Sequence, residues 1–227
     1  MANFVLVPGG FVGGWYWSEV ADRLRKSGHR VETIDLPSSG NDPAELGDLA
    51  ADAETVRQAV ERVGEPVVLV GQSYGGMVIT ELADHPAVTH SVYVAALWPE
   101  RGQSAMDVLA DGPPVTWAAA HDDGTLRVID DLEELRQKLC ADVEPQHAYG
   151  ILRRFRPQSL SSVTAPSDAP ERGHPATYVI CERDQALPLS VQERVAAAAD
   201  HHHRLPSSHA PMASMPDELA DLLDRVR

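Results

Sequence analysis

The chain has 227 residues, 43% of them hydrophobic and 23% charged, which is enough for a single domain with a substantial buried core. Its formal net charge of −15 opposes binding to phosphate backbones or to anionic membrane surfaces, because both need clustered Lys and Arg. Nucleic acid and membranes are therefore not expected as partners.

The N-terminus reads "MANFVLVPGG", with no basic segment and an apolar stretch too short for a signal core or a membrane span. The two cysteines, Cys140 and Cys181, do not indicate a disulfide framework. A cytoplasmic location is expected from both features.

Five segments have the composition of strands. Short apolar runs rich in valine and isoleucine are typical of strands covered on both faces of a parallel sheet. The segments are residues 4–7, 29–36, 67–70, 91–97 and 177–181. The second is the weakest, because its apolar residues alternate with polar ones.

Helical periodicity fills most of the intervals between these strands. Leu49, Ala53, Val56 and Val60 follow one another in steps of three and four, which places them on one helix face. Helices are predicted over residues 15–27, 43–63, 75–84, 188–199 and 216–226. Alternating strands and helices predict an α/β fold, a mostly parallel sheet flanked by helices.

The alternation is interrupted between residues 98 and 173, where seven prolines and two helical segments, 130–142 and 145–155, occur without a strong strand. We interpret this segment as a small helical cap inserted after the fourth core strand. The predicted core is then residues 1–97 and 174–227, with a cap of residues 98–173.

A serine stands at the end of the third strand, in "VVLVGQSYGG". Gly71, Ser73 and Gly75 form a G-x-S-x-G pattern between a strand and a helix, a sharp turn that exposes a nucleophilic hydroxyl and needs small residues on both sides. The pattern alone is weak, and Ser73 as an ordinary turn residue is the alternative. The strand before it and the helix after it favour a nucleophile.

A serine nucleophile needs a base and an acid. In this architecture they follow in the order Ser, acid, His, with the histidine in a loop before the last helix. Of the ten histidines, His209 meets that condition, whereas His201–His203 favour the last strand or the surface. Asp184 follows the strand "TYVIC" and would orient the imidazole. Glu182 is the neighbouring candidate for the same role. A purely structural role for Asp184, as a cap of the helix near 188–199, is the other alternative.

A glycine-rich loop, "VPGGFVGGW", follows the first strand. It could supply the Gly10 amide as one oxyanion donor, with the amide of Tyr74 at the helix N-terminus as the other. A nucleotide loop is the alternative, but the G-x-G-x-x-G spacing and a Gly-Lys-Ser/Thr sequence are both absent.

Four motifs in this order, "FVLVPGGFVGGWYW", "GQSYGG", "YVICERDQALP" and "SSHAPMASMP", resemble the α/β-hydrolase superfamily. Within it the chain is similar to the compact branch of plant methylesterases, hydroxynitrile lyases and related bacterial esterases. The resemblance implies an α/β-hydrolase fold with Ser73 as nucleophile, His209 as base, Asp184 as acid, and the Gly10 and Tyr74 amides as the oxyanion hole.

Departures from the family pattern separate the esterases from the lyases. Lyase members typically carry a threonine where this chain has Gly9, and a lysine after the histidine where it has Ala210. Esterase members have a glycine and a nearby methionine, as in Gly9 and Met212. Two further differences are Pro8 and Gln72, which stand where the family often has histidine.

The sequence therefore predicts a serine hydrolase that cleaves a small ester through an acyl-enzyme, with no cofactor or metal. Hydroxynitrile lyase chemistry, a cyclisation or rearrangement, and a ligand receptor on the same fold are the alternatives. Expected pocket residues, each of which could equally be core packing, are Phe11, Val12, Trp98 and Met212. The expected partner is a small ester-like molecule, and a homodimer is compatible with the sequence.

Overall fold

The structure is a computed structural model that describes residues 1–110 and 112–226. Asp111 in the predicted cap and Arg227 at the end of the predicted core lie outside the described residues.

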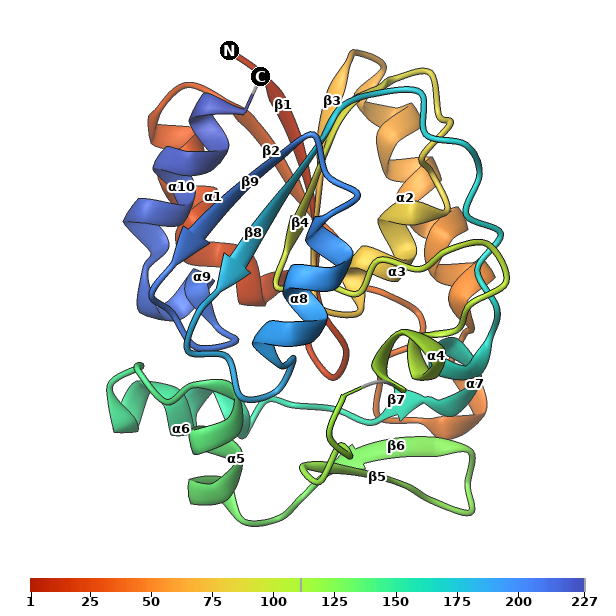
Figure 1. Cartoon of the computed structure of the whole chain (residues 1–227), viewed down its shortest axis with the longest axis vertical. Helices are drawn as coiled ribbons and strands as arrows, with labels where there is room; N and C mark the ends of the chain where they lie inside the picture. The colour runs from red at the N-terminus through yellow and green to blue at the C-terminus, as the bar shows by residue number, and fades with distance from the viewer. Residues whose placement is uncertain (111, 227) are drawn as a thin grey trace.

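A six-stranded sheet forms the centre of the molecule, in the order β2-β1-β3-β4-β8-β9 (Figure 1). All of its strand pairs are parallel. The strands are β1 (Asn3–Val7), β2 (Arg30–Thr33), β3 (Val67–Gln72), β4 (Val88–Val94), β8 (Ala176–Cys181) and β9 (His201–Leu205). The interior strands β1, β3 and β8 are buried along their whole length, which explains their continuous apolar sequences. The predicted parallel sheet is confirmed.

Helices cover both faces of this sheet because alternate side chains of each strand point to opposite faces. Phe4 and Leu6 belong to a hydrophobic cluster with α1 and α10, whereas Val5 and Val7 belong to a second cluster with α2, α3 and α8. The core helices are α1 (Ser18–Lys26), α2 (Leu49–Val63), α3 (Gly75–Thr80), α8 (Leu189–Ala196), α9 (Pro211–Ser214) and α10 (Pro216–Arg225). Two 3-10 turns, η1 (Gly14–Trp17) and η2 (Pro43–Glu45), precede α1 and α2.

Local signals fix the ends of α2, the longest of these helices. The Asp48 side chain accepts a hydrogen bond from the Ala51 amide at its start, and Gly64 adopts a left-handed conformation, with φ of 66°, at its end. Its buried face belongs to the same hydrophobic cluster as Val67 and Leu69 of β3, the strand that precedes Ser73.

The chain between β4 and β8 forms the cap, which lies beyond the carboxyl ends of the core strands (Figure 1). Its helices are α4 (Ala105–Leu109), α5 (Leu132–Leu139), α6 (Pro145–Leu152) and α7 (Leu160–Thr164). Both helical segments predicted there, 130–142 and 145–155, contain a helix. The packing of α5 and α6 continues the hydrophobic cluster of α1 and α10.

The cap is not purely helical, although its sequence shows no strong strand. It contains a three-stranded antiparallel sheet of β5 (Ala118–Ala120), β6 (Thr125–Val128) and β7 (Gln158–Ser159). The first two strands form a hairpin around Gly124, which has a φ of 77°. An Asp-Gly pair is a hairpin signal, but the alanines of β5 have low strand preference and conceal it.

Strand β9 is the exposed edge of the main sheet and begins with His201–His203. Within the described residues, no helix combines the length and the apolar character needed to cross a membrane.

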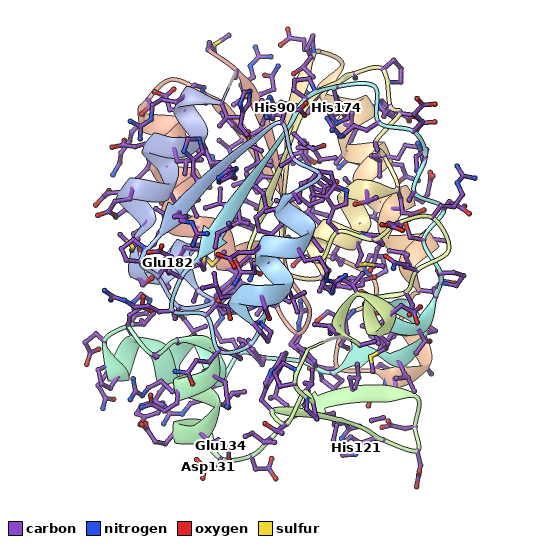
Figure 2. The ribbon with its side chains drawn as sticks, viewed as in Figure 1. His90, His121, Asp131, Glu134, His174 and Glu182 are labelled. Carbon is purple, nitrogen blue, oxygen red and sulfur yellow. The ribbon has the colours of Figure 1, made fainter. Side chains whose placement is uncertain are left out.

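Two buried histidines lie at the opposite end of the sheet from the cap, where Figure 2 labels them. His174 Nε2 is 2.7 Å from Ser91 Oγ, and His90 Nε2 is 2.9 Å from Thr177 Oγ1. Burial, followed by the charges of Arg172 and His90, lowers the pKa of His174 to about 4.

This histidine should make the fold sensitive to acid. Below its ordinary pKa of about 6.5 the unfolded chain takes up a proton, whereas the folded ring stays neutral until pH falls to about 4. We expect stability to fall over that interval, with His174 contributing on the order of 1–2 kcal/mol. Urea unfolding at pH 7.5 and 4.5 should show a smaller loss for His174→Gln than for the wild type. His121→Gln, at an exposed cap position (Figure 2), is the control and should behave like the wild type; equal losses in all three proteins would contradict the assignment.

Candidate active site

Ser73 stands on a strained turn between β3 and α3. Its φ of 51° lies in the left-handed region, which for a residue other than glycine costs on the order of 1–3 kcal/mol. Backbone hydrogen bonds hold it there: its amide donates to Val94 O at 3.3 Å, and its carbonyl accepts from the amides of Gly76 and Leu97 at 3.0 Å. The turn is therefore anchored to the strand beside it.

Close backbone packing explains both glycines of the G-x-S-x-G sequence. A Cβ on Gly71 would come within 2.6 Å of the Gly75 carbonyl oxygen. A Cβ on Gly75 would come within 2.6 Å of the Pro8 carbonyl oxygen and 2.7 Å of that of Val7. Both contacts are too short for any side chain, so the turn can form only with glycine at these positions.

His209 lies in the loop between β9 and α9, and its Nδ1 is 2.7 Å from Asp184 Oδ2. The Asp184 carboxylate also accepts hydrogen bonds from the Ala186 and Leu187 amides at 2.8 Å, and from Gln192 Nε2 at 3.2 Å. These donors fix its orientation, so that it holds the imidazole with Nε2 directed away from the acid.

Glu182, the rival acid, is exposed and pairs with Arg204 (3.5 Å), so it is not the carboxylate that contacts His209. Asp184 also organises the turn before α8 through its bonds to the backbone. Asp184 is not the cap of α8, because the N-cap of that helix is Pro188 and carries no side-chain hydrogen bond; Asp184 fixes the turn before the helix and contacts the histidine.

Gln72, a departure from the family pattern, connects the serine turn to the histidine loop. Its buried side chain donates from Nε2 to the His209 carbonyl oxygen at 3.2 Å. A Cβ on Gly9 would lie 2.5 Å from Gln72 Oε1, so the glycine leaves room for the glutamine. A side chain at position 9 would therefore collide with the Gln72 side chain.

The loop after β1 brings backbone amides to the same region. Phe11 has a φ of 68°, and both of its backbone groups are bound by the cap: its amide donates to Gln158 Oε1 at 3.2 Å, and its carbonyl accepts from the Arg156 amide at 2.8 Å. The Gly10 and Tyr74 amides have no acceptor among the described residues. Both donors are therefore free for a ligand.

A buried carboxylate lies behind Tyr74. The Tyr74 hydroxyl donates to Asp52 Oδ2 at 2.7 Å, and the Ser38 amide donates to Asp52 Oδ1 at 2.9 Å. Burial raises the pKa of Asp52 to about 6, although the hydrogen bonds from Ser38 and Tyr74 oppose the rise. Burial and the adjacent Asp52 raise the pKa of Tyr74 well above its ordinary value, so the hydroxyl remains a donor.

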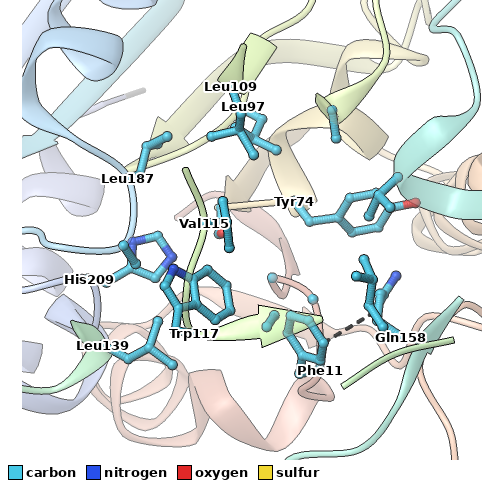
Figure 3. Close-up of a pocket in the computed structure, with 18 of the residues that line it drawn as sticks. Phe11, Tyr74, Leu97, Leu109, Val115, Trp117, Leu139, Gln158, Leu187 and His209 are labelled. Atoms are coloured by element: carbon cyan, nitrogen blue, oxygen red, sulfur yellow. Dashed lines mark hydrogen bonds between the residues drawn. The ribbon is translucent and has the colours of Figure 1, made fainter. Parts of the chain in front are cut away.

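Ser73 and His209 line one cavity of about 540 Å³ between the sheet and the cap (Figure 3). Most of its wall is apolar, and no Lys, Arg, Asp or Glu is among the described residues that line it. Trp117, Leu139 and Phe155 of the cap face the site together with Phe11. A cavity of this size and polarity suits a small, uncharged organic molecule.

Two of the four residues expected in the pocket line it in the structure. Phe11 and Val12 line the cavity, whereas Trp98 and Met212 are not among its described lining residues. The Trp98 ring stacks on Tyr93 with centroids 4.0 Å apart, and Met212 is buried in the cluster of α1 and α10. Apolar character alone does not distinguish a pocket wall from a core.

Sequence reasoning missed Gln158 and Asp52. Asp52 lies between Leu49 and Val56 on the apolar face of α2, and a carboxylate in that position is a signal that could have been used. Gln158 had no comparable signal, because its partners are up to 147 residues away in the chain.

No group of three or more His, Cys, Asp or Glu side chains in the described parts of the chain is arranged to hold a metal ion. The residues gathered around Ser73 instead carry the elements of nucleophilic catalysis: a hydroxyl, an imidazole oriented by a carboxylate, and free backbone amides.

Comparison with known proteins agrees with this architecture. Residues 4–222 match the sequence profile described as the alpha/beta hydrolase family. A carbendazim hydrolyzing esterase of Nocardioides sp. is 31% identical, with 98% of each chain covered. Methylesterase 2 of Arabidopsis thaliana is 25% identical, with 97% of this chain and 94% of the relative covered.

A solved structure of a pyrethroid hydrolase from Sphingobium faniae superposes with a TM-score of 0.86, at 25% identity over 98% of this chain and 96% of that one. The chain belongs to the α/β-hydrolase family, as its motifs predicted. The three similar proteins are all described as hydrolases or esterases.

The buried Asp52 should reduce stability at neutral pH. As pH rises above about 4 the carboxylate ionises in the unfolded chain, but in the folded protein it stays protonated until about pH 6, so folding loses stability over that interval. The Asp52→Asn variant cannot ionise. We expect it to gain roughly 2–3 kcal/mol relative to the wild type between pH 4 and pH 7. Chemical denaturation of both proteins across this range measures the difference, and a pH-independent difference would exclude the raised pKa.

Proposed function

We propose that the chain is a serine hydrolase that cleaves carboxylic esters through an acyl-enzyme. The observation that carries this proposal is the convergence of Ser73 and His209 on one apolar cavity, with His209 oriented by Asp184. Its family membership and its esterase relatives support the same reaction class.

In the proposed reaction Ser73 Oγ attacks the ester carbonyl carbon while His209 Nε2 takes the hydroxyl proton. The carbonyl π electrons move onto oxygen and return as the bond to the leaving alkoxide breaks. His209 gives its proton to that alkoxide, which leaves as an alcohol. Water, deprotonated by the same nitrogen, then attacks the acyl carbon, and His209 returns the proton to Ser73 Oγ as its bond to the acyl group breaks, which releases the acid and the free serine.

The developing oxyanion would accept hydrogen bonds from the Gly10 and Tyr74 amides. Neither amide has an acceptor among the described residues, so neither has to break a bond before it can stabilise the charge. Asp184 holds the imidazole in place and stabilises the imidazolium that forms during each step.

The pocket favours a neutral ester with apolar groups. Its wall offers aromatic and aliphatic surface from Phe11, Trp117, Leu139 and Phe155. No cationic side chain is among the described lining residues, so the charge of a substrate carboxylate would not be neutralised there. The relatives described as carbendazim and pyrethroid hydrolases support a substrate of this class. The cytoplasmic location and the homodimer stay predictions from the sequence.

The lyase alternative has less support. Cyanide release would need a nearby cation, whereas Ala210 follows the histidine and the described wall of the cavity carries neither lysine nor arginine. A cyclisation or rearrangement is distinguished from hydrolysis by whether the product has gained water.

Substitution of the nucleophile tests the mechanism. Ser73→Ala should lower ester turnover at least about 1,000-fold and abolish labelling by a fluorophosphonate, with circular dichroism unchanged, because the attacking hydroxyl is lost. Ser91→Ala is the matched control: Ser91 Oγ is 2.7 Å from His174 Nε2, but Ser91 is not among the described residues that line the cavity. Full activity in Ser73→Ala, or loss of labelling in Ser91→Ala, would contradict the proposal.

Substrate charge tests the pocket. A 4-nitrophenyl ester of hexanoic acid and the 4-nitrophenyl monoester of adipic acid have the same reacting group, but the second carries a terminal carboxylate. We expect kcat/KM to be at least tenfold lower for the charged ester, because the apolar wall would leave the carboxylate unpaired. Equal values for the two esters would show that the acyl chain does not enter this cavity.

A further inference from the structure

A chain of buried hydrogen bonds connects the two loops that carry the proposed oxyanion donors. Gln158 of the cap accepts from the Phe11 amide through Oε1 at 3.2 Å and donates from Nε2 to Ser38 Oγ at 2.8 Å. The Ser38 amide donates to Asp52 Oδ1 at 2.9 Å, and Asp52 Oδ2 accepts from the Tyr74 hydroxyl at 2.7 Å. Phe11 directly follows Gly10, so the chain ends beside one donor and on the residue that supplies the other.

Every side chain in this series is deeply buried. Ser38 and Asp52 are fully buried, Gln158 is 1% exposed and Tyr74 is 3% exposed. Gln158 Nε2 also donates to Ser162 Oγ at 2.7 Å, so its amide is fixed by three partners. Polar groups shielded from water in this way hold their geometry strongly, because a broken bond leaves an unsatisfied group.

The backbone at both ends needs such support. Phe11 has a φ of 68° and Ser73, which precedes Tyr74, has a φ of 51°; both are left-handed conformations that persist only when surrounding contacts impose them. The cap binds the Phe11 carbonyl through the Arg156 amide and the Phe11 amide through Gln158. Without these bonds the loop that carries Gly10 would be free to relax.

We propose that Gln158 and Asp52 are positioning residues that hold the Gly10 and Tyr74 amides in register for the transition-state oxyanion. The inference rests on the proposed function, and it adds a role for the cap: one of its side chains completes the alignment of the catalytic backbone. Neither residue exchanges a proton or contacts the reacting atoms in this role.

The first test removes one hydroxyl. Tyr74→Phe keeps the backbone amide and the ring but loses the donor to Asp52. We expect kcat to fall about tenfold with KM within twofold, because a misaligned donor weakens binding of the transition state more than binding of the substrate. Tyr93→Phe is the matched control, since its buried hydroxyl, 3.0 Å from Thr80 Oγ1, lies outside this hydrogen-bond chain.

The second test removes the cap contact. Gln158→Met loses all three hydrogen bonds at similar volume, whereas Gln158→Glu keeps an oxygen that can accept from Phe11. We expect Gln158→Met to lower kcat tenfold or more and Gln158→Glu to recover part of the loss. The Tyr74→Phe/Gln158→Met double variant should lose less than the product of the single effects, because both changes act on one network.

Inhibition by a trifluoromethyl ketone separates alignment from a general loss of structure. Its adduct with the serine carries an oxyanion, so its inhibition constant should rise in proportion to the fall in kcat/KM in each variant. Thermal unfolding checks that the proteins are folded; if Gln158→Met does not fold, Tyr74→Phe and Gln158→Glu carry the test. An inactive wild type would overturn the proposed function. An active wild type with unchanged kcat in Tyr74→Phe, or with an equal fall in Tyr93→Phe, would overturn the positioning role alone.

Discussion

The site depends on one backbone constraint, the left-handed conformation of Ser73 at the end of β3. Ser73 lines the cavity in this conformation, and the turn requires backbone contact so close that Gly71 and Gly75 cannot carry side chains. Bonds to Val94 and Leu97 anchor the turn to the neighbouring strand and the segment after it. A parallel sheet with helices on both faces provides the rigid support on which such strain can persist.

Around this turn, residues far apart in sequence supply the other groups. Gln72 connects the turn to the carbonyl of His209, and Asp184, in the loop that follows β8, fixes the imidazole. The cap contributes most of the apolar wall and also binds the backbone of Phe11 through Gln158. The pocket wall and the loop that carries Gly10 therefore share their supports, and the cap does more than cover the site.

The central sheet could be predicted from sequence because β1, β3 and β8 are buried on both faces and read as uninterrupted apolar runs. The sequence also predicted that Ser73 follows a strand and that His209 lies in the loop before the last helix. The cap could not be predicted in the same way. Its strands β5 to β7 are two to four residues long, and Ala118–Ala120 carries no strand preference. Trp98 and Met212 were expected in the pocket because large apolar side chains look the same in a wall and in a core.

Residues 156–159 attach the cap to the core. Pro157 and Ser159 bond to the backbone at Gly40 and Ser38, so this short stretch is fastened to the core on both sides of Gln158. The hairpin of β5 and β6 is bound to this stretch in turn: β6 pairs with Gln158 and Ser159 of β7, and the Gly124 carbonyl accepts from the Leu160 amide at 2.8 Å. A change in the hairpin that shifts β6 would therefore also move Gln158 and, through it, the backbone of Phe11, so a graft that alters the pocket wall has to keep the pairing of β6 with β7.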